Sequence, residues 1–139
     1  HWRKPMAEAM RDLGADHIWV VHGHDGLDEI STTGPTSVTE VIDGKISEFE
    51  MSPEDYGIDK AAMDDLRGGH PEENAKALSG LLRGETGPYR DIVLLNSGAA
   101  LMIAGIAKDI SDGIIKAQNA IDSGNAGAAL KKLIEISSR

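Results

Sequence analysis

Alternating apolar and polar residues mark the clearest element of the chain, a β-hairpin. Residues 37–42 and 45–50 both alternate with a period of two, and Asp43-Gly44 separates them. Such alternation is typical of strands with one buried face, and an Asp-Gly dipeptide suits the positive φ values of a tight type I′ turn. We therefore predict an antiparallel hairpin with one solvated face, at the edge of a sheet.

A continuous apolar run, Ile18–Val21, predicts a second kind of strand over residues 17–22. Strands that are apolar on both faces usually lie inside a sheet that is covered on each side, so we expect this strand in the interior. It stops at Gly23, and the adjacent acids Asp28 and Glu29 follow after a second glycine. Open α/β sheets commonly place their ligands beyond the ends of such strands.

Residues at helical spacing occupy most of the remaining chain. A helix is predicted before the first strand, over residues 5–13, and Gly14 ends it. A turn-rich segment follows the hairpin over residues 52–69, with a short helical turn at 60–66. Four further helices are predicted over residues 71–83, 89–107, 111–123 and 126–137.

Spacing also predicts the caps and inner faces of these helices. Pro71 suits the first turn of the helix that it opens, and Ser111 is expected to cap the helix that follows it. The residues expected to face the core are Met6, Ala9, Met10 and Leu13 in the first helix, and Ala75, Leu78, Leu81 and Leu82 in the helix that begins at residue 71. The predicted fold class is α/β, with an antiparallel edge hairpin and a helical C-terminal half.

Composition favours one globular domain over residues 1–139. Hydrophobic residues make up 40% of the chain and charged residues 27%, which is ordinary for a folded domain. Aromatic residues make up only 4%, so the core must be mainly aliphatic. No repeat, low-complexity tract or linker divides the sequence.

The charge balance argues against two classes of partner. The net charge is −9, from 23 acidic and 14 basic residues, whereas nucleic-acid binders usually present a basic patch. Anionic membrane surfaces are disfavoured for the same reason. The longest apolar run, residues 99–107, is far shorter than the roughly 20 residues of a membrane span. We expect a cytoplasmic protein without nucleic-acid or membrane partners. The sequence contains no cysteine, which excludes disulfides, thiolate catalysis and sulfur-rich zinc sites.

Asp28 and Glu29 are the candidate metal ligands. Adjacent carboxylates suit a hard cation such as Mg²⁺, which is typically held by one or two carboxylates together with substrate phosphates. Neighbouring side chains of an extended chain point to opposite faces, so the pair can chelate one ion only if the backbone turns there. Otherwise the two acids serve separate ions, or one of them binds through water. The simplest alternative is that both are solvated loop acids.

Other polar residues favour structural roles. His22 and His24 flank a glycine, but two histidines without a third ligand make a poor zinc site, so we interpret them as loop residues. Asn96 interrupts an apolar helix and is expected to hydrogen-bond neighbouring backbone. Arg67 is expected to form a salt bridge or a cap.

Several motifs together resemble the C-terminal half of anthranilate phosphoribosyltransferase. The specific signature is His22-Gly23 followed by Gly26-Leu27-Asp28-Glu29. The likeness covers nearly all of the chain, and its other segments are Lys4–Ala9, Leu66–Gly69, Pro71–Asn74 and Arg90–Asn96. The resemblance implies a domain of the nucleoside phosphorylase/phosphoribosyltransferase type, in which the family's Mg²⁺-binding acids match Asp28 and Glu29. It also implies transfer of the phosphoribosyl group of phosphoribosyl pyrophosphate to anthranilate, with release of pyrophosphate, in tryptophan biosynthesis.

The resemblance also implies that parts are missing. Family members begin with a helical domain and bind the diphosphate on a glycine-rich loop, and this sequence contains neither. We therefore expect a fragment that is inactive alone and that forms a homo-oligomer through an open sheet edge. Two alternatives remain, a non-catalytic binding or assembly module on the same scaffold and a pyrimidine-nucleoside phosphorylase. The contiguous residues 26–29 after His22-Gly23 argue against the phosphorylase.

Overall fold

Three strands form one antiparallel sheet in the computed structural model, which describes residues 1–138. The central strand β2 (Thr36–Ile42) pairs with β1 (His17–Gly23) on one side and with β3 (Lys45–Met51) on the other. The predicted antiparallel hairpin is confirmed as the β2–β3 pair. Its turn residues Asp43 and Gly44 have the positive φ values of 50° and 75°. The predicted division into one buried and one solvated face is wrong, because residues 36–39 of the central strand are all buried whereas residues 47–50 of the edge strand are all exposed.

The position of β1 differs from the prediction of an interior strand. β1 lies at one edge of the sheet, and its outer side pairs with no strand within residues 1–138. Residues 17–21 are only half-buried, whereas Val38, Thr39 and Val41 of β2 are fully enclosed. An apolar run indicates that a strand can be covered on two faces, but it does not say which strands flank it. Association of two copies through this open edge stays a prediction.

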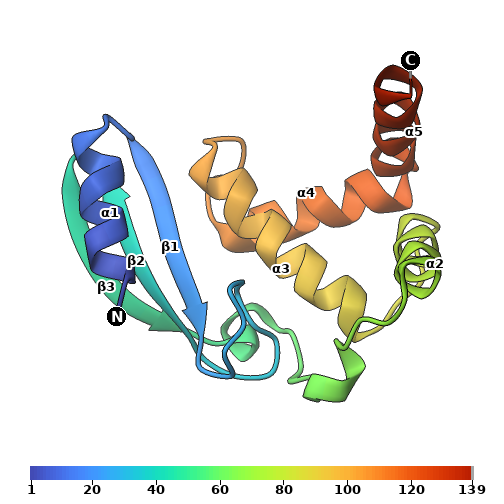
Figure 1. Ribbon diagram of the computed structural model, residues 1–139, viewed down its shortest axis with the longest axis horizontal. Coiled ribbons are helices and arrows are strands. Elements are labelled where there is room, and N and C mark those ends of the chain that lie inside the picture. Colours follow the sequence, from blue (N-terminus) through green and yellow to red (C-terminus); the bar gives the residue numbers. More distant parts are fainter. Residues whose placement is uncertain (139) are drawn as a thin grey trace.

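Helices lie on both faces of the sheet (Figure 1). Helix α1 (Arg3–Asp12) contacts β1 and β2 on one face. On the other face, Val38 belongs to an apolar cluster with Leu95 of α3 (Pro88–Ile103) and Ile110 of α4 (Ile110–Asp122). This cluster is the main core of the molecule, and it is aliphatic as predicted.

The remaining helices lie beyond α3 and α4, away from the sheet (Figure 1). They are α2 (Pro71–Leu82) and α5 (Asn125–Ser137), and two short 3₁₀ turns, η1 (Pro53–Tyr56) and η2 (Met63–Asp65), connect the sheet to α2. The crossing of α3 and α4 is close, since a Cβ atom added at Gly113 would lie 2.3 Å from the Gly98 carbonyl oxygen. None of the helices described for residues 1–138 has the length and apolar character needed to cross a membrane.

Two predicted inner faces are wrong. In α1 the buried residue is Ala7, while Met6, Met10 and Leu13 are 53%, 43% and 83% exposed. In α2 only the last turn is covered: Leu81 is buried and Leu82 is half-buried, but Leu78 and Ala75 are exposed. Helical spacing predicts which residues share a face, but whether another element covers that face depends on the tertiary structure.

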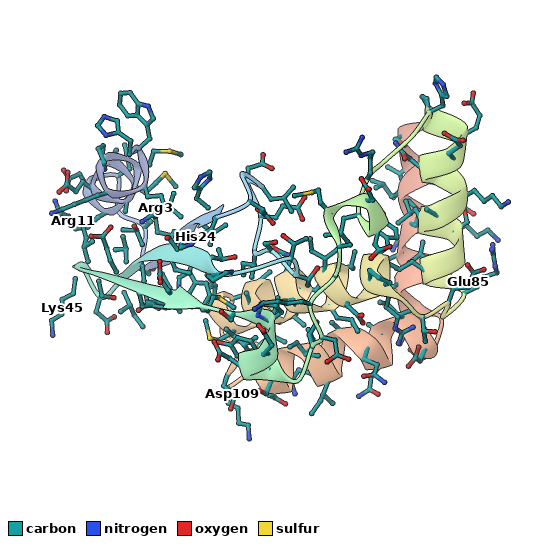
Figure 2. The ribbon with its side chains drawn as sticks, turned by 90° about the horizontal axis from the view of Figure 1, so that it is seen from below. Arg3, Arg11, His24, Lys45, Glu85 and Asp109 are labelled. Atoms are coloured by element: carbon teal, nitrogen blue, oxygen red, sulfur yellow. The ribbon has the colours of Figure 1, made fainter. Side chains whose placement is uncertain are left out.

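The predicted cap of α4 is also wrong. The N-cap is Asp109 (Figure 2), whose side chain accepts a hydrogen bond from the backbone N–H of Asp112 at 2.8 Å. Ser111 lies inside the helix. Aspartate and serine are both favoured at the N-cap position, so residue type alone does not decide between Asp109 and Ser111.

Candidate functional site

The two predicted metal ligands lie on the acidic loop, which we define as residues 24–33, between β1 and β2. The chain turns sharply at once after β1, because the Gly23 N–H donates to the Leu27 carbonyl at 2.9 Å and the Gly26 N–H donates to the Gly23 carbonyl at 3.0 Å. Gly26 has a φ of +96°, which side-chain-bearing residues rarely adopt. The backbone then bends at both Asp28 and Glu29.

Asp25 holds the two ends of the acidic loop together. Its carboxylate accepts hydrogen bonds from the hydroxyls of Ser31 and Thr33 and, at 2.9 Å, from the Leu27 backbone N–H. Burial by itself would raise the pKa of Asp25, but the hydrogen bonds from Ser31, Thr33 and Leu27 outweigh it, and the net result is a lowered pKa. Asp25 therefore stays ionised and links the turn before the acidic pair to the segment after it.

Gly23 leaves the space that this arrangement needs. A Cβ atom at this position would lie 2.4 Å from Asp25 Oδ1 and 3.2 Å from Ser31 Cβ. A side chain at residue 23 would therefore force a shift of Asp25 Oδ1, the oxygen that accepts from the Leu27 N–H. The glycine of the His22-Gly23 motif thus has a packing reason in this structure.

A second anchor ties the acidic loop to α3. The Asn96 side chain accepts a hydrogen bond from the Ile30 N–H at 3.0 Å and donates one to the Ile30 carbonyl at 2.8 Å. The Ile30 side chain is 4% exposed and belongs to the main core. The prediction that Asn96 bonds backbone is confirmed, although this partner is distant in the sequence.

Asp28 and Glu29 are exposed between these two anchors. Neither carboxylate forms a hydrogen bond or ion pair with any of residues 1–138, so their oxygen atoms face solvent rather than a protein donor. Asp28 also lines, with His22, an open groove of about 630 Å³ between α1 and β1. The fold thus presents two carboxylates on a backbone that is held firmly on each side.

This donor set fits Mg²⁺ better than zinc. The described residues contain no group of three or more His, Cys, Asp or Glu side chains placed to hold a metal ion, whereas structural zinc sites need four such ligands. Mg²⁺ commonly takes only one or two carboxylates and completes its shell with water and phosphate oxygen atoms. The backbone bends at Asp28 and Glu29, so the opposite-face arrangement of an extended chain does not apply to this pair.

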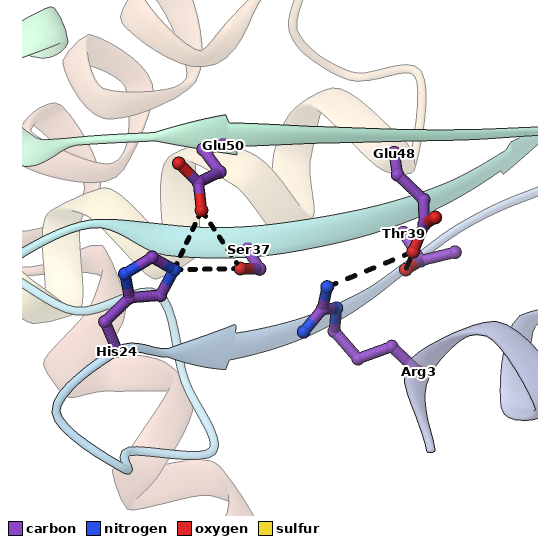
Figure 3. Close-up of polar contacts among 6 residues, drawn as sticks. All are labelled: Arg3, His24, Ser37, Thr39, Glu48 and Glu50. Atoms are coloured by element: carbon purple, nitrogen blue, oxygen red, sulfur yellow. Dashed lines mark hydrogen bonds and ion pairs between the residues drawn. The ribbon is translucent and has the colours of Figure 1, made fainter. Parts of the chain in front are cut away.

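His24 takes part in a polar network on the α1 face of the sheet (Figure 3). Its Nε2 atom lies 2.9 Å from Ser37 Oγ and 2.9 Å from Glu50 Oε1. A nucleophile–base–acid relay needs the acid and the nucleophile on different ring nitrogens, but here one nitrogen meets both groups. The interpretation of His24 as a structural loop residue agrees with this geometry.

The remaining sequence candidates lie apart from the acidic loop. Arg67 forms an exposed ion pair with Asp64 at 3.2 Å, which confirms the predicted salt bridge. His70 stands at the N-cap of α2, and its backbone N–H donates to Glu73 Oε2 at 2.7 Å. Sequence reasoning missed Asp25, because nothing in the local pattern separates a loop-bracing aspartate from a solvated one.

Comparison with known proteins agrees with this description. Residues 2–127 match the family described as the glycosyl transferase family, a/b domain. A relative named anthranilate phosphoribosyltransferase, from Parvibaculum lavamentivorans, is 54% identical over 133 residues, which cover 96% of this chain and 39% of the relative. The chain thus spans about two fifths of the length of the curated relatives it matches.

Solved structures give the same result. Anthranilate phosphoribosyltransferase from Thermus thermophilus superposes with a TM-score of 0.87 at 39% identity, over 96% of this chain and 39% of that one. The enzyme of the same name from Saccharomyces cerevisiae, in complex with PRPP and Mg, has a TM-score of 0.78 at 30% identity, over 87% of this chain and 35% of that one. The predicted resemblance and the α/β fold class are confirmed, and the chain belongs to the glycosyl transferase family through its a/b domain.

Proposed function

We propose that this chain provides the Mg²⁺-binding part of an anthranilate phosphoribosyltransferase. The whole reaction transfers the phosphoribosyl group of phosphoribosyl pyrophosphate to anthranilate and releases pyrophosphate. The observation that carries the proposal is the acidic loop, where Asp28 and Glu29 are exposed, without protein partners in residues 1–138, and bracketed by two anchors. Family membership and the name of the relatives support the choice of reaction.

The chemistry explains why carboxylates are needed at this place. Departure of pyrophosphate from the ribose C1 builds negative charge on the leaving group, and bound Mg²⁺ supplies Lewis-acid stabilisation of those oxygen atoms. Asp28 and Glu29 hold the cation with two negative charges. A chain of net charge −9 would by itself repel a diphosphate. A cation held by the two carboxylates would offset this repulsion and allow the diphosphate to bind.

The attacking group does not depend on a protein nucleophile. The amine of anthranilate is neutral and attacks the anomeric carbon directly, so positioning of the two substrates supplies much of the catalysis. Because the chain spans 39% of its relative, we place in it the metal-binding role alone. We expect the 139-residue chain by itself to form no phosphoribosylanthranilate, as measured by loss of anthranilate fluorescence.

Isothermal titration with Mg²⁺ and phosphoribosyl pyrophosphate tests the metal-binding role. The variants are Asp28→Asn and Glu29→Gln, which keep the shape and remove the charge. Loss of a group that holds or orients a metal should weaken the Mg²⁺-dependent affinity on the order of 10- to 100-fold. Asp64→Asn is the matched control, because Asp64 also belongs to an adjacent acidic pair.

The control should bind like the unmodified chain. If both amide variants also keep the parental Mg²⁺ dependence, the pair is ordinary loop charge and the proposal fails. Binding that is independent of Mg²⁺ would instead favour a non-catalytic binding module on this scaffold.

A further inference from the structure

Asn96 makes an unusual set of contacts for a residue in the middle of a helix. Besides its two hydrogen bonds with the Ile30 backbone, its Nδ2 atom donates to the Ile92 carbonyl one turn earlier, at 2.9 Å. All three hydrogen bonds of the side-chain amide are thus directed at backbone groups. The side chain is therefore held in one orientation between α3 and the acidic loop.

The contact with Ile30 acts on Glu29. The Ile30 N–H and the Glu29 carbonyl belong to the same peptide unit, which is planar. A hydrogen bond that fixes the Ile30 N–H therefore also fixes the orientation of the Glu29 carbonyl group. Because Asn96 bonds the Ile30 carbonyl too, the peptide units on both sides of Ile30 are constrained.

We propose that Asn96 is a positioning residue for the metal site, which sets the direction of the Glu29 carboxylate through the backbone of Ile30. The inference rests on the proposed function, since it assumes that Glu29 holds Mg²⁺. It adds a residue of the helical half of the chain, 66 positions from Ile30, to a site whose ligands lie beside the sheet.

The residue type suits this role. A primary amide carries both an acceptor and donors, so it can pair with the N–H and the carbonyl of one residue at once. An aspartate could accept from the Ile30 N–H but would place a negative oxygen against the Ile30 carbonyl. An alanine would leave both backbone groups of Ile30, a buried residue, without these partners.

The chain contains a matched control for this contact. Asn74 pairs in the same way with Gly69, accepting from its N–H at 2.8 Å and donating to its carbonyl at 3.1 Å. That contact is exposed and spans five residues, in the segment that leads into α2. It has the same chemistry as the Asn96 contact, but its partner Gly69 is not next to either of the proposed metal ligands.

Mn²⁺ titration followed by NMR tests the inference. Mn²⁺ replaces Mg²⁺ as the probe because it broadens the amide signals of residues near the ion, and the 139-residue chain is used as it stands. The variants are Asn96→Ala, Asn96→Asp, Asn74→Ala and Asp28→Asn. Exchange of the Ile30 amide with deuterium is measured on the same samples, since the proposal requires this amide to lose protection in Asn96→Ala.

We expect both Asn96 variants to weaken Mn²⁺ binding at the acidic loop about 10-fold, the lower end of the effect of removing a group that orients a metal ligand. Asn74→Ala should leave it unchanged. The aspartate variant is the sharper test, because its added negative charge alone would strengthen cation binding. A loss of affinity in that variant can only come from lost orientation, and it carries the test if Asn96→Ala fails to fold.

The two ways of failing are distinguishable. If Asp28→Asn abolishes broadening while both folded Asn96 variants bind like the unmodified chain, the positioning role is wrong and the metal site stands. If the unmodified chain shows no broadening around residues 28 and 29, the metal site is wrong and the positioning role falls with it.

Discussion

Two pairs of adjacent acids, Asp28-Glu29 and Asp64-Asp65, look alike in the sequence and differ in the structure. Asp65 Oδ2 accepts a hydrogen bond from the Ala62 N–H at 3.0 Å, and Asp64 forms an ion pair with an arginine three residues later. Neither acid of the first pair has a partner within residues 1–138. The second pair stabilises its own 3₁₀ turn, while the first presents its oxygen atoms to solvent.

The backbones under the two pairs are held by different contacts. The turn that carries Asp64 and Asp65 is closed by a contact within the turn, between Asp65 and the Ala62 N–H. The chain just before it is joined to the acidic loop by a hydrogen bond from the Ala61 N–H to the Thr32 carbonyl at 2.9 Å. The acidic loop is also tied to α3 through Asn96 and to the main core through Ile30. Both segments thus have contacts with distant parts of the chain, and the clearest difference lies in the side chains, since the carboxylates of Asp28 and Glu29 are open whereas those of Asp64 and Asp65 have partners.

The largest expected effect comes from weakening the core beneath the acidic loop. Leu95 is fully buried and shares a cluster with Ile30, so Leu95→Ala should lower the free energy of unfolding on the order of 2–5 kcal/mol. Leu78→Ala is the control near the other segment, and at 38% exposure it should cost less than about 1 kcal/mol. Urea denaturation measures both, and equal losses would contradict the difference in anchoring.

An intermediate effect should separate the two acidic pairs by stability. Asp65→Ala removes the acceptor for the Ala62 N–H and should cost about 1 kcal/mol. Asp28→Ala removes an exposed side chain without a partner in residues 1–138, and it should change the free energy of unfolding by no more than about 0.5 kcal/mol. Thermal and urea denaturation of the two variants, side by side, test this order. A larger loss for Asp28→Ala would mean that its carboxylate has a structural role.

The smallest expected effect concerns the stability of the folded chain at low pH. Hydrogen bonding lowers the pKa of Asp25 in the folded chain below its ordinary value of 3.8, despite the opposing effect of burial. A lowered pKa stabilises the fold above the pKa of the unfolded chain, and this contribution disappears as pH falls through the folded pKa. The advantage of the unmodified chain over Asp25→Asn should thus be complete well above the ordinary pKa of 3.8 and shrink as the pH falls below it.

The change should be small, because the carboxylate is mostly solvent-exposed. Urea denaturation at a series of pH values measures it. An advantage that grows on acidification would have the wrong sign and would exclude Asp25 as an ionised brace of the acidic loop.

Local patterns predicted much of the fold. The hairpin, its Asp43-Gly44 turn and the helices lie close to their predicted bounds, because alternation, turn residues and helical spacing act over a few neighbouring positions. The exposed faces of α1 and α2 were not predictable in this way. Amphipathic spacing identifies a face that can be buried, and only the arrangement of other elements decides whether it is.

The acidic pair shows the same division. The sequence by itself determined that two carboxylates follow a strand and a pair of glycines, and with the motif around them it indicated the family. Only the tertiary structure decided that Asp28 and Glu29 are open, whereas the partners of Asp64 and Asp65 lie within three residues of them. It also decided that Asn96 holds the backbone next to Glu29. The physical reason is distance along the chain, since a contact across 66 positions forms only when the core brings α3 and the acidic loop together.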